Sequence, residues 1–415
     1  MAWCRAFVPF LTFLLFGLLS IDGTATAFSI EDYDANIAKA LNGEFTILGT
    51  LEKGVDLGTE DTNLNYLVKA LYKRFGKESF ATFLSQKGDT LDIPGFRITS
   101  NGVKGEGSYG KVFAMSAESK TSFSSSIKNL KKVRFEIAVK MLKKIPQRSL
   151  DKYDLEVELN NMKFLPTIRS SDGFAFAVPY YGAFIDKDKQ AFILTKLMSE
   201  SLADYTTKEE KVLSDADIDR FITSLGSGLA TWQALGFVHN DIKPDNIMRD
   251  SNGNFYFIDF GTTRRLTPTQ MRDGNTHVDR FKGRKGTLMA NIGTPAMMSP
   301  EKILNDRSVL GPINWGESDV YSFGMALWAV LSHQSEPALF KRCAESGSCT
   351  ERFQKGDMGE EDFNAFRAFA QGLIPVGPRE PRAIKAAKRL VVRLLTWRPS
   401  DRPSNILTAY REELR

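Results

Sequence analysis

The sequence predicts an α+β protein with two lobes, a small β-rich lobe followed by a larger α-helical lobe. Short runs of β-branched and aromatic residues, separated by glycine-containing loops, fill the chain from about Phe96 to Ile193. From Asp215 onward, apolar residues recur mainly at helical spacing. No period of roughly 20–50 residues repeats, so a solenoid is excluded. Strands first and helices afterwards are typical of two-lobed α+β proteins.

Composition places the chain among globular proteins. The 415 residues are 42% hydrophobic and 25% charged, which allows several packed units and argues against wholesale disorder. The formal net charge is only +5, and no block of lysine and arginine dominates. We therefore expect no nucleic acid among the partners.

The first 27 residues have the pattern of a secretory signal peptide. Arg5 precedes an apolar run too short for an ordinary membrane span, and the small residues at Ala25–Ala27 offer a cleavage site. An uncleaved anchor is the alternative, which Pro9 and Gly17 disfavour. No later segment is long and apolar enough to span a bilayer, so we expect a protein of the secretory pathway or the exterior, without a transmembrane span.

The pattern of residues 28–95 predicts a helical extension. Leu64, Leu67, Leu71 and Phe75 recur at the three- and four-residue spacing of an amphipathic helix. A segment of about 60 residues is marginal for independent folding, so we expect it to pack on the domain that follows.

That second domain would span residues 96–415. Its β-rich lobe is expected over about 96–198 and its helical lobe over about 199–415. A polar, serine-rich stretch at 116–132 is expected to form a loop insertion between two strands. The stretch "DKYDLEVELNNMKFL" then predicts a helix within the β-rich lobe.

Two cysteines of the helical part are candidates for a disulfide. Cys4 leaves with the signal peptide, and Cys343 and Cys349 remain, separated by five residues. In an oxidising compartment such a pair can close a small loop, and the alternative is two unpaired surface thiols. The histidines fall in no zinc-binding pattern.

A glycine-rich stretch, "GEGSYGKV", has the spacing of a phosphate-binding loop. Glycines at such a turn let backbone N–H groups approach a phosphate closely. A dinucleotide-binding loop is the alternative, but it requires a helix directly afterwards, and "KVFAM" is strand-like. The stretch comprises Gly105, Gly107, Ser108, Tyr109, Gly110 and Val112.

Lys140 ends the next predicted strand, in "EIAVK". The stretch matches the V-A-I-K pattern, in which a fixed ammonium group holds the phosphates of ATP. Such a lysine needs an anionic partner, and the following helix offers Glu158, with Glu156 as the alternative. A lone lysine on a strand is usually a solvated surface charge, so this interpretation depends on the neighbouring motifs.

Further motifs follow in a fixed order. The stretch "VHNDIKPDNI" fits the pattern H-R-D-x-K-x-x-N, and "IDFG", "SPE", "SDVYSFG" and "LLTWRPSDRPS" come after it. Over Phe96 to the C-terminus the chain resembles the eukaryotic protein kinases of the Ser/Thr type. The motif residues are His239, Asn240, Asp241, Lys243, Asn246, Asp259, Phe260, Gly261, Ser299, Pro300, Glu301, Asp319 and Arg402.

The resemblance implies a bilobal kinase fold and roles in phosphoryl transfer. Asp241 would accept or orient the substrate hydroxyl, and Lys243 would stabilise the transferring phosphoryl group. Asn246 and Asp259 would hold Mg²⁺, for which Mn²⁺ can substitute. A lysine at position 243 and Thr294 resemble the Ser/Thr kinases. ATP and protein substrates are the expected partners.

The resemblance also implies an adenine site between the lobes. Val112 and Ala138 would contact ATP, and Thr195 is the gatekeeper-like residue. The hinge whose backbone holds adenine would be Lys196, Leu197 and Met198. Glu301 and Arg402 would form a buried structural ion pair, and Asp319 would begin a structural helix.

Two departures from the family pattern lie in the segment between Asp259 and Glu301. Met297 and Ser299 replace the usual tyrosine and alanine, which can alter how substrate is seated. The segment is also rich in lysine and arginine. It is either a solvated flexible loop or a contact for an acidic substrate, a partner or a membrane surface.

Asn240 stands where most kinases have an arginine. That arginine binds a phosphate on the activation loop, and a neutral asparagine cannot neutralise one. We expect a non-RD kinase that is not switched on through this contact. In the simpler alternative, Asn240 only forms a hydrogen bond with the loop backbone.

A finer resemblance combines several of these features. The signal peptide, the helical extension, Asn240 and the spaced cysteines together are similar to the secreted rhoptry kinases of apicomplexan parasites. This resemblance implies injection into a host cell and host proteins as substrates. The alternative to an active enzyme is a pseudokinase-like scaffold that binds a partner through the kinase surface.

Overall fold

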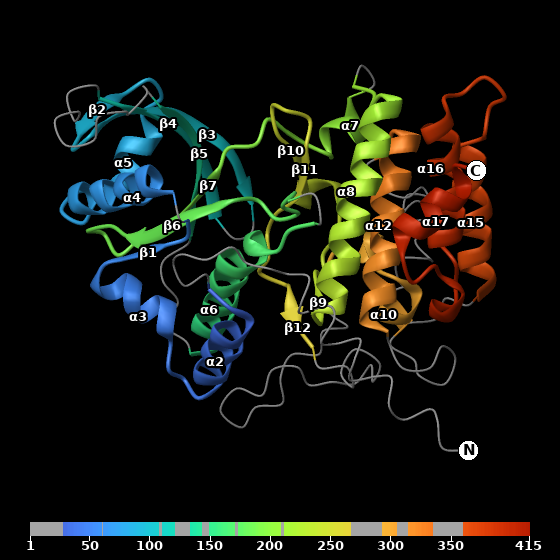
Figure 1. The fold of residues 1–415 in the computed structure, drawn as a ribbon, viewed down its shortest axis with the longest axis horizontal. Coiled ribbons are helices and arrows are strands. Elements are labelled where there is room, and N and C mark those ends of the chain that lie inside the picture. The colour runs from blue at the N-terminus through green and yellow to red at the C-terminus, as the bar shows by residue number, and fades with distance from the viewer. Residues whose placement is uncertain are drawn as a thin grey trace, which may run out of the picture.

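A seven-stranded antiparallel sheet forms the N-terminal lobe of the computed structural model (Figure 1). The strand order is β1-β6-β7-β5-β4-β3-β2. The strands are β1 (Val55–Leu57), β2 (Thr90–Ile93), β3 (Phe96–Gly107), β4 (Gly110–Ser119), β5 (Arg134–Leu142), β6 (Tyr180–Ile185) and β7 (Ala191–Lys196). The structure describes residues 28–59, 61–107, 110–120, 133–142, 149–170, 173–208, 211–266, 293–304, 314–334 and 360–415.

Five helices accompany this sheet in the described part of the chain. They are α2 (Ile30–Leu41), α3 (Thr46–Lys53), α4 (Thr62–Phe75), α5 (Phe80–Ser85) and α6 (Ser149–Phe164). The helix expected from the leucine spacing is α4, which begins after the capping carboxylate of Asp61. Leu67, Leu71 and Phe80 share one buried cluster with Phe113 of the sheet.

The extension also supplies strands to the sheet. Its edge strand β1 pairs with β6, so that Val55 lies opposite Phe184, and β2 pairs with β3. Neither strand was expected from the sequence, because segments of three or four residues carry too little alternation to be recognised. Residues 28–95 are therefore built into the lobe as well as packed on it.

The helical lobe is organised around α12 (Trp315–Ser332), which lies beside α8 (Asp215–Ala234) in Figure 1. Nearly all of α12 is buried, as expected for a central helix that is mostly apolar. In the described part of this lobe, the other α-helices are α7 (Asp204–Thr207), α10 (Pro300–Leu304), α15 (Glu360–Leu373), α16 (Arg382–Leu394) and α17 (Ile406–Glu413). The short strands are β8 (Glu200–Ser201), β9 (Phe237–Val238), β10 (Ile247–Arg249), β11 (Phe255–Phe257) and β12 (Arg264–Arg265).

The predicted α+β plan is confirmed, with strands in the N-terminal lobe and helices in the C-terminal lobe. Strand β4 runs to Ser119, so the start of the expected insertion at 116–132 is strand. Several sequence predictions fall outside the described residues: the signal peptide at 1–27, Ser108, Tyr109, Cys343, Cys349 and most of the basic activation segment.

Helix α3 is capped by a carboxylate from another helix. The residue before it, Phe45, makes no side-chain capping bond. Instead, the buried Glu156 of α6 accepts hydrogen bonds from the backbone N–H groups of Ile47 at 2.7 Å and Leu48 at 2.9 Å. A negative charge at a helix N-terminus satisfies donors that have no partner within the helix. Glu156 thereby joins the extension to α6.

Glu156→Gln is expected to destabilise the protein by about 1–3 kcal/mol, because the amide NH₂ group would face an N–H donor that needs an acceptor. Denaturant unfolding of the two proteins measures this difference. Glu52→Gln is the matched control, since Glu52 is exposed on α3 itself. Equal midpoints for Glu156→Gln and wild type would show that the carboxylate does not hold α3.

Candidate active site

Lys140 of β5 lies in a cluster of two carboxylates. Its Nζ is 2.6 Å from Glu158 Oε1 on α6 and 3.4 Å from Asp259 Oδ1. Burial opposes the charge, but Glu158 and Asp259 raise the pKa of Lys140 above its ordinary value. The ammonium group therefore stays charged at neutral pH.

The two candidate glutamates of α6 face different neighbours. Successive helix residues are rotated by about 100°, so Glu156 and Glu158 point about 200° apart. Glu158 contacts Lys140, whereas Glu156 caps α3. The sequence favoured Glu158 with Glu156 as the alternative, and it is Glu158 that contacts Lys140.

The glycine-rich stretch forms the turn between β3 and β4, where Gly107 lies opposite Gly110. At Gly105 a Cβ atom would meet nothing within 4 Å, so one side of the strand is open. Gly110 has φ of +147°, and its Cβ would lie 2.1 Å from the carbonyl oxygen of Met141. Only glycine fits there, and the turn can approach a phosphate closely.

Val112 and Ala138 lie on the strands next to this turn. Val112 is opposite Lys140 in the pairing of β4 with β5. Ala138 is opposite Thr195 in the pairing of β5 with β7, so the strands place both residues beside the lysine and the gatekeeper-like threonine.

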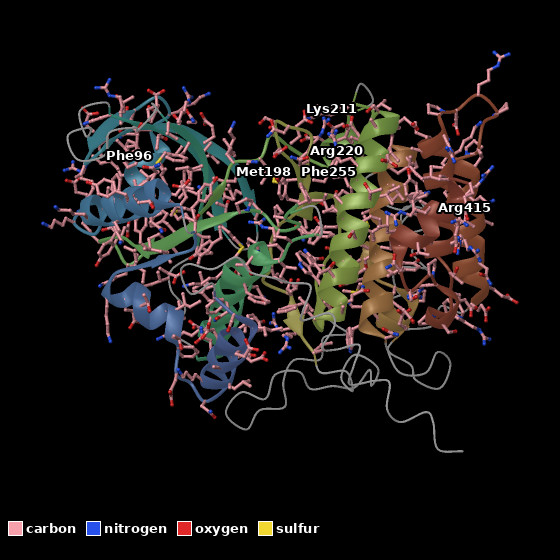
Figure 2. The ribbon with its side chains drawn as sticks, viewed as in Figure 1. Phe96, Met198, Lys211, Arg220, Phe255 and Arg415 are labelled. Carbon is pink, nitrogen blue, oxygen red and sulfur yellow. The ribbon has the colours of Figure 1, made fainter. Side chains whose placement is uncertain are left out.

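The connection between the lobes begins at the end of β7. Met198, labelled in Figure 2, lies where the strand-rich part meets the helical part. Leu197 donates its backbone N–H to Glu136 O at 3.1 Å, which leaves that group unavailable to a ligand. Lys196 Nζ is 2.7 Å from Asp250 Oδ2, so a side chain of the hinge is tied to the β10–β11 turn.

The catalytic-loop stretch is anchored on α12. The carboxylate of Asp319 accepts hydrogen bonds from the backbone N–H of His239 at 2.6 Å and of Asn240 at 2.9 Å. Asn240 adopts φ of +69°, a left-handed conformation that asparagine tolerates better than most residues. His239 packs on the buried ring of Phe260 at 5.7 Å between centroids.

Asp241 is held by three side chains. Thr294 Oγ1 donates to its Oδ1 at 2.8 Å, and Asn246 Nδ2 donates to its Oδ2 at 3.0 Å. Lys243 Nζ lies 3.2 Å from Oδ2 and also donates to Thr294 at 2.9 Å. Burial alone would raise the pKa of Asp241, but the charge of Lys243 and the hydroxyl of Thr294 lower it below its ordinary value.

Asp259 and Asn246 offer oxygen atoms close to these groups. Within the described residues, no cluster of three or more histidine, cysteine, aspartate or glutamate side chains could hold a metal by itself. Mg²⁺ commonly uses one or two side chains and completes its shell with phosphate oxygens and water. The carboxylate of Asp259, which lies near the charged Lys140, is suited to bind Mg²⁺ that is bound to a nucleoside triphosphate.

A buried asparagine that the sequence analysis missed joins α6 to the segment after Asp259. Asn161 Nδ2 donates to the carbonyl oxygens of Phe260 and Thr263, both at 3.0 Å. Its Oδ1 accepts from the hydroxyl of Tyr33 on α2 at 2.8 Å. Asparagine is a poor helix former, so adjacent asparagines inside a predicted helix were the available signal.

A buried ion pair connects the end of the activation segment with the C-terminal part. Arg402 donates to both carboxylate oxygens of Glu301, at 2.6 and 2.7 Å. The guanidinium group also donates to the carbonyl oxygens of Thr396, Glu317 and Trp397. Both side chains are almost completely excluded from solvent.

Fold and site together define a two-lobed protein in which Lys140 of the sheet contacts Glu158 of α6 and Asp259 of the helical lobe. The chain belongs to the protein kinase domain family, whose pattern matches residues 99–413.

Several curated kinases are similar to parts of the chain. Serine/threonine-protein kinase SSK22 of Saccharomyces cerevisiae is 33% identical over 35% of this chain and 11% of its own length. NUAK family SNF1-like kinase 1 of Mus musculus is 27% identical over 55% of this chain and 28% of its own. Dual specificity protein kinase shkA of Dictyostelium discoideum is 28% identical over 59% of this chain and 39% of its own. The chain thus spans well under half the length of these relatives.

In the described ranges, no helix is both long and apolar enough to cross a bilayer.

Proposed function

We propose that the chain is a serine/threonine protein kinase that transfers the γ-phosphoryl group of ATP, with Mg²⁺, to hydroxyl groups of proteins. The observation that carries this proposal is the network of Asp241, Lys243 and Thr294. It presents a deprotonated carboxylate beside a fixed ammonium group. Named kinases of the serine/threonine type among the similar proteins support the same choice.

The side chains of both lobes would divide the work of the reaction. When bound, ATP would supply the phosphoryl group, and Mg²⁺ would neutralise negative charge on the phosphates. Lys140 and the glycine-rich turn would hold the phosphates, and Asn246 and Asp259 would hold the metal. Asp241, which is ionised at neutral pH, would accept the proton of the substrate hydroxyl, while Lys243 stabilises charge on the transferred group.

Phosphate transfer by the purified chain from Phe28 onward tests this function. We expect Mg²⁺-dependent transfer from γ-³²P-labelled ATP to serine and threonine of a generic basic protein, and none from the Asp259→Ala variant. Phosphoamino-acid analysis distinguishes serine and threonine from tyrosine. Equal signals from wild type and Asp259→Ala would refute the enzyme and favour a scaffold that binds partners through the kinase surface.

We also propose that the protein acts after export, in the secretory pathway or as a rhoptry-type effector on host proteins. The support is the signal-like pattern of residues 1–27 and the spacing of Cys343 and Cys349. A mature N-terminus at Phe28 in the exported protein would support the proposal. Retention of residues 1–27 in a cytosolic protein would refute it.

A further inference from the structure

A buried lysine contacts the residue that directly precedes Asp241. Lys302, in α10, is 3% exposed. Its Nζ donates to Asn240 Oδ1 at 2.5 Å and to the backbone carbonyl oxygen of Asn240 at 3.3 Å. The ammonium group also lies 6.0 Å from the ring centroid of Trp315. Lys302 directly follows Glu301 in the sequence, but no motif pattern marks it as a site residue.

The surroundings keep this buried group charged. Burial lowers the pKa of Lys302 to about 8, and the negative charges of Asp319, Asp241 and Glu301 oppose a larger decrease. Lys302 therefore remains largely protonated at neutral pH. Burying an ammonium group is costly unless hydrogen bonds and opposite charges compensate for the lost hydration. A buried lysine at this position therefore calls for an explanation.

The chain closes tightly around the contact. Gly293, which directly precedes Thr294 in the activation segment, has φ of +117°. A Cβ at Gly293 would lie 2.6 Å from the carbonyl oxygen of Asn240 and 3.4 Å from Lys302 Nζ. Three segments thus meet at Asn240: the catalytic loop, the stretch that carries Thr294, and α10.

Asn240 and Lys302 complement each other in charge. The side-chain oxygen of asparagine can accept from an ammonium group, whereas an arginine at position 240 would bring two cations together. The left-handed conformation of Asn240 directs both its side-chain and carbonyl oxygens to the same donor.

We propose that Lys302 is a positioning residue for phosphoryl transfer, which fixes the catalytic loop to α10 through Asn240. The link holds Asp241 in register with Thr294 and the substrate-binding end of the activation segment. An internal cation thereby orders this part of the site without a phosphate group on the chain. The inference rests on the proposed kinase activity.

The variant Lys302→Met removes the charge and keeps the length of the side chain. We expect kcat to fall by about 10–100-fold, because small displacements of reacting groups have effects of this size. KM for ATP should stay within about two-fold, since the hydrogen bonds of Lys302 described above go to Asn240 of the catalytic loop. Lys302→Arg should recover most of the loss. The control is Lys208→Met, which removes an exposed ammonium group paired with Asp204.

If Lys302 only stabilised the fold, its variants would change the unfolding midpoint and not kcat. If Lys302→Met lowered the unfolding midpoint but left kcat of the folded fraction unchanged, or if Lys302→Arg restored nothing, the proposal would be wrong. Should Lys302→Met not fold, Asn240→Gly replaces it, because glycine accepts φ of +69° and removes only the side-chain acceptor. The same split between kcat and KM is expected for Asn240→Gly, and an unchanged kcat would overturn the proposal.

A second readout separates this inference from the proposed function. Hydrogen exchange of the His239 and Asn240 amides, which donate to Asp319, reports on order in the loop without any activity. We expect at least about ten-fold faster exchange in Lys302→Met than in wild type, with unchanged exchange in α12. If wild type transfers no phosphate but this difference appears, the kinase proposal fails and the link survives. Identical exchange would refute the link.

Discussion

Replacing Asp241 with asparagine is expected to lower kcat for phosphoryl transfer by about 10³-fold, in the range found when a general base is removed. Asparagine keeps the size of the side chain and can still accept from Thr294, but it loses the negative charge and cannot accept a proton. Lys243 would also lose the partner that lies 3.2 Å from its ammonium group. Initial-rate measurements at saturating ATP and substrate give the change in kcat.

The same loop offers a matched control for this variant. Asp245 is exposed, and Asp245→Asn makes the identical chemical change four residues later. We expect its kcat to stay within about two-fold of wild type, because surface substitutions away from the chemistry have small effects. A loss of only a few-fold for Asp241→Asn, or an equal loss in both variants, would show that Asp241 is not the base.

Arg402→Met is expected to destabilise the helical lobe by about 3–5 kcal/mol, the cost typical of breaking a buried ion pair by removing one partner. The carboxylate of Glu301 would remain buried without its two donors. Three carbonyl oxygens would lose a donor as well. A lower midpoint of denaturant unfolding, with the slope unchanged, measures this effect.

Arg398→Met is the control for the ion-pair variant. Arg398 is 65% exposed in its side chain and lies 4.0 Å from Glu360, so its pair is screened by water. We expect a change within about 0.5 kcal/mol. Adding Glu301→Gln to Arg402→Met should recover part of the loss, because the buried charge disappears. If Arg402→Met and Arg398→Met had equal stabilities, the buried pair would contribute nothing.

The sequence was most informative where chemistry requires fixed residue types at fixed spacing. Asp241, Asn246 and Asp259 could be singled out because they fall in short motifs that resemble those of the protein kinases. The fold class followed from the change in hydrophobic period near the middle of the chain. Both kinds of signal are local, so one sequence suffices to read them.

Features that depend on distant neighbours could not be read in this way. The sequence favoured Glu158 as the partner of Lys140, but it gave no sign that Glu156 caps α3. The roles of Asn161 and Lys302 depend on contacts with carbonyl oxygens about 60 to 100 residues away in sequence. Such contacts are set by packing, which composition and periodicity do not describe.

The pairing of β1 with β6 has a consequence for how the chain folds during synthesis. Val55 cannot form its native pairing until Phe184 has left the ribosome, because these residues lie opposite each other in the finished sheet. Closing so long a loop is entropically costly and slows the formation of native contacts. Strand β1 thus cannot complete its native pairing until β6 has been synthesised, and until then it stays open to chaperones.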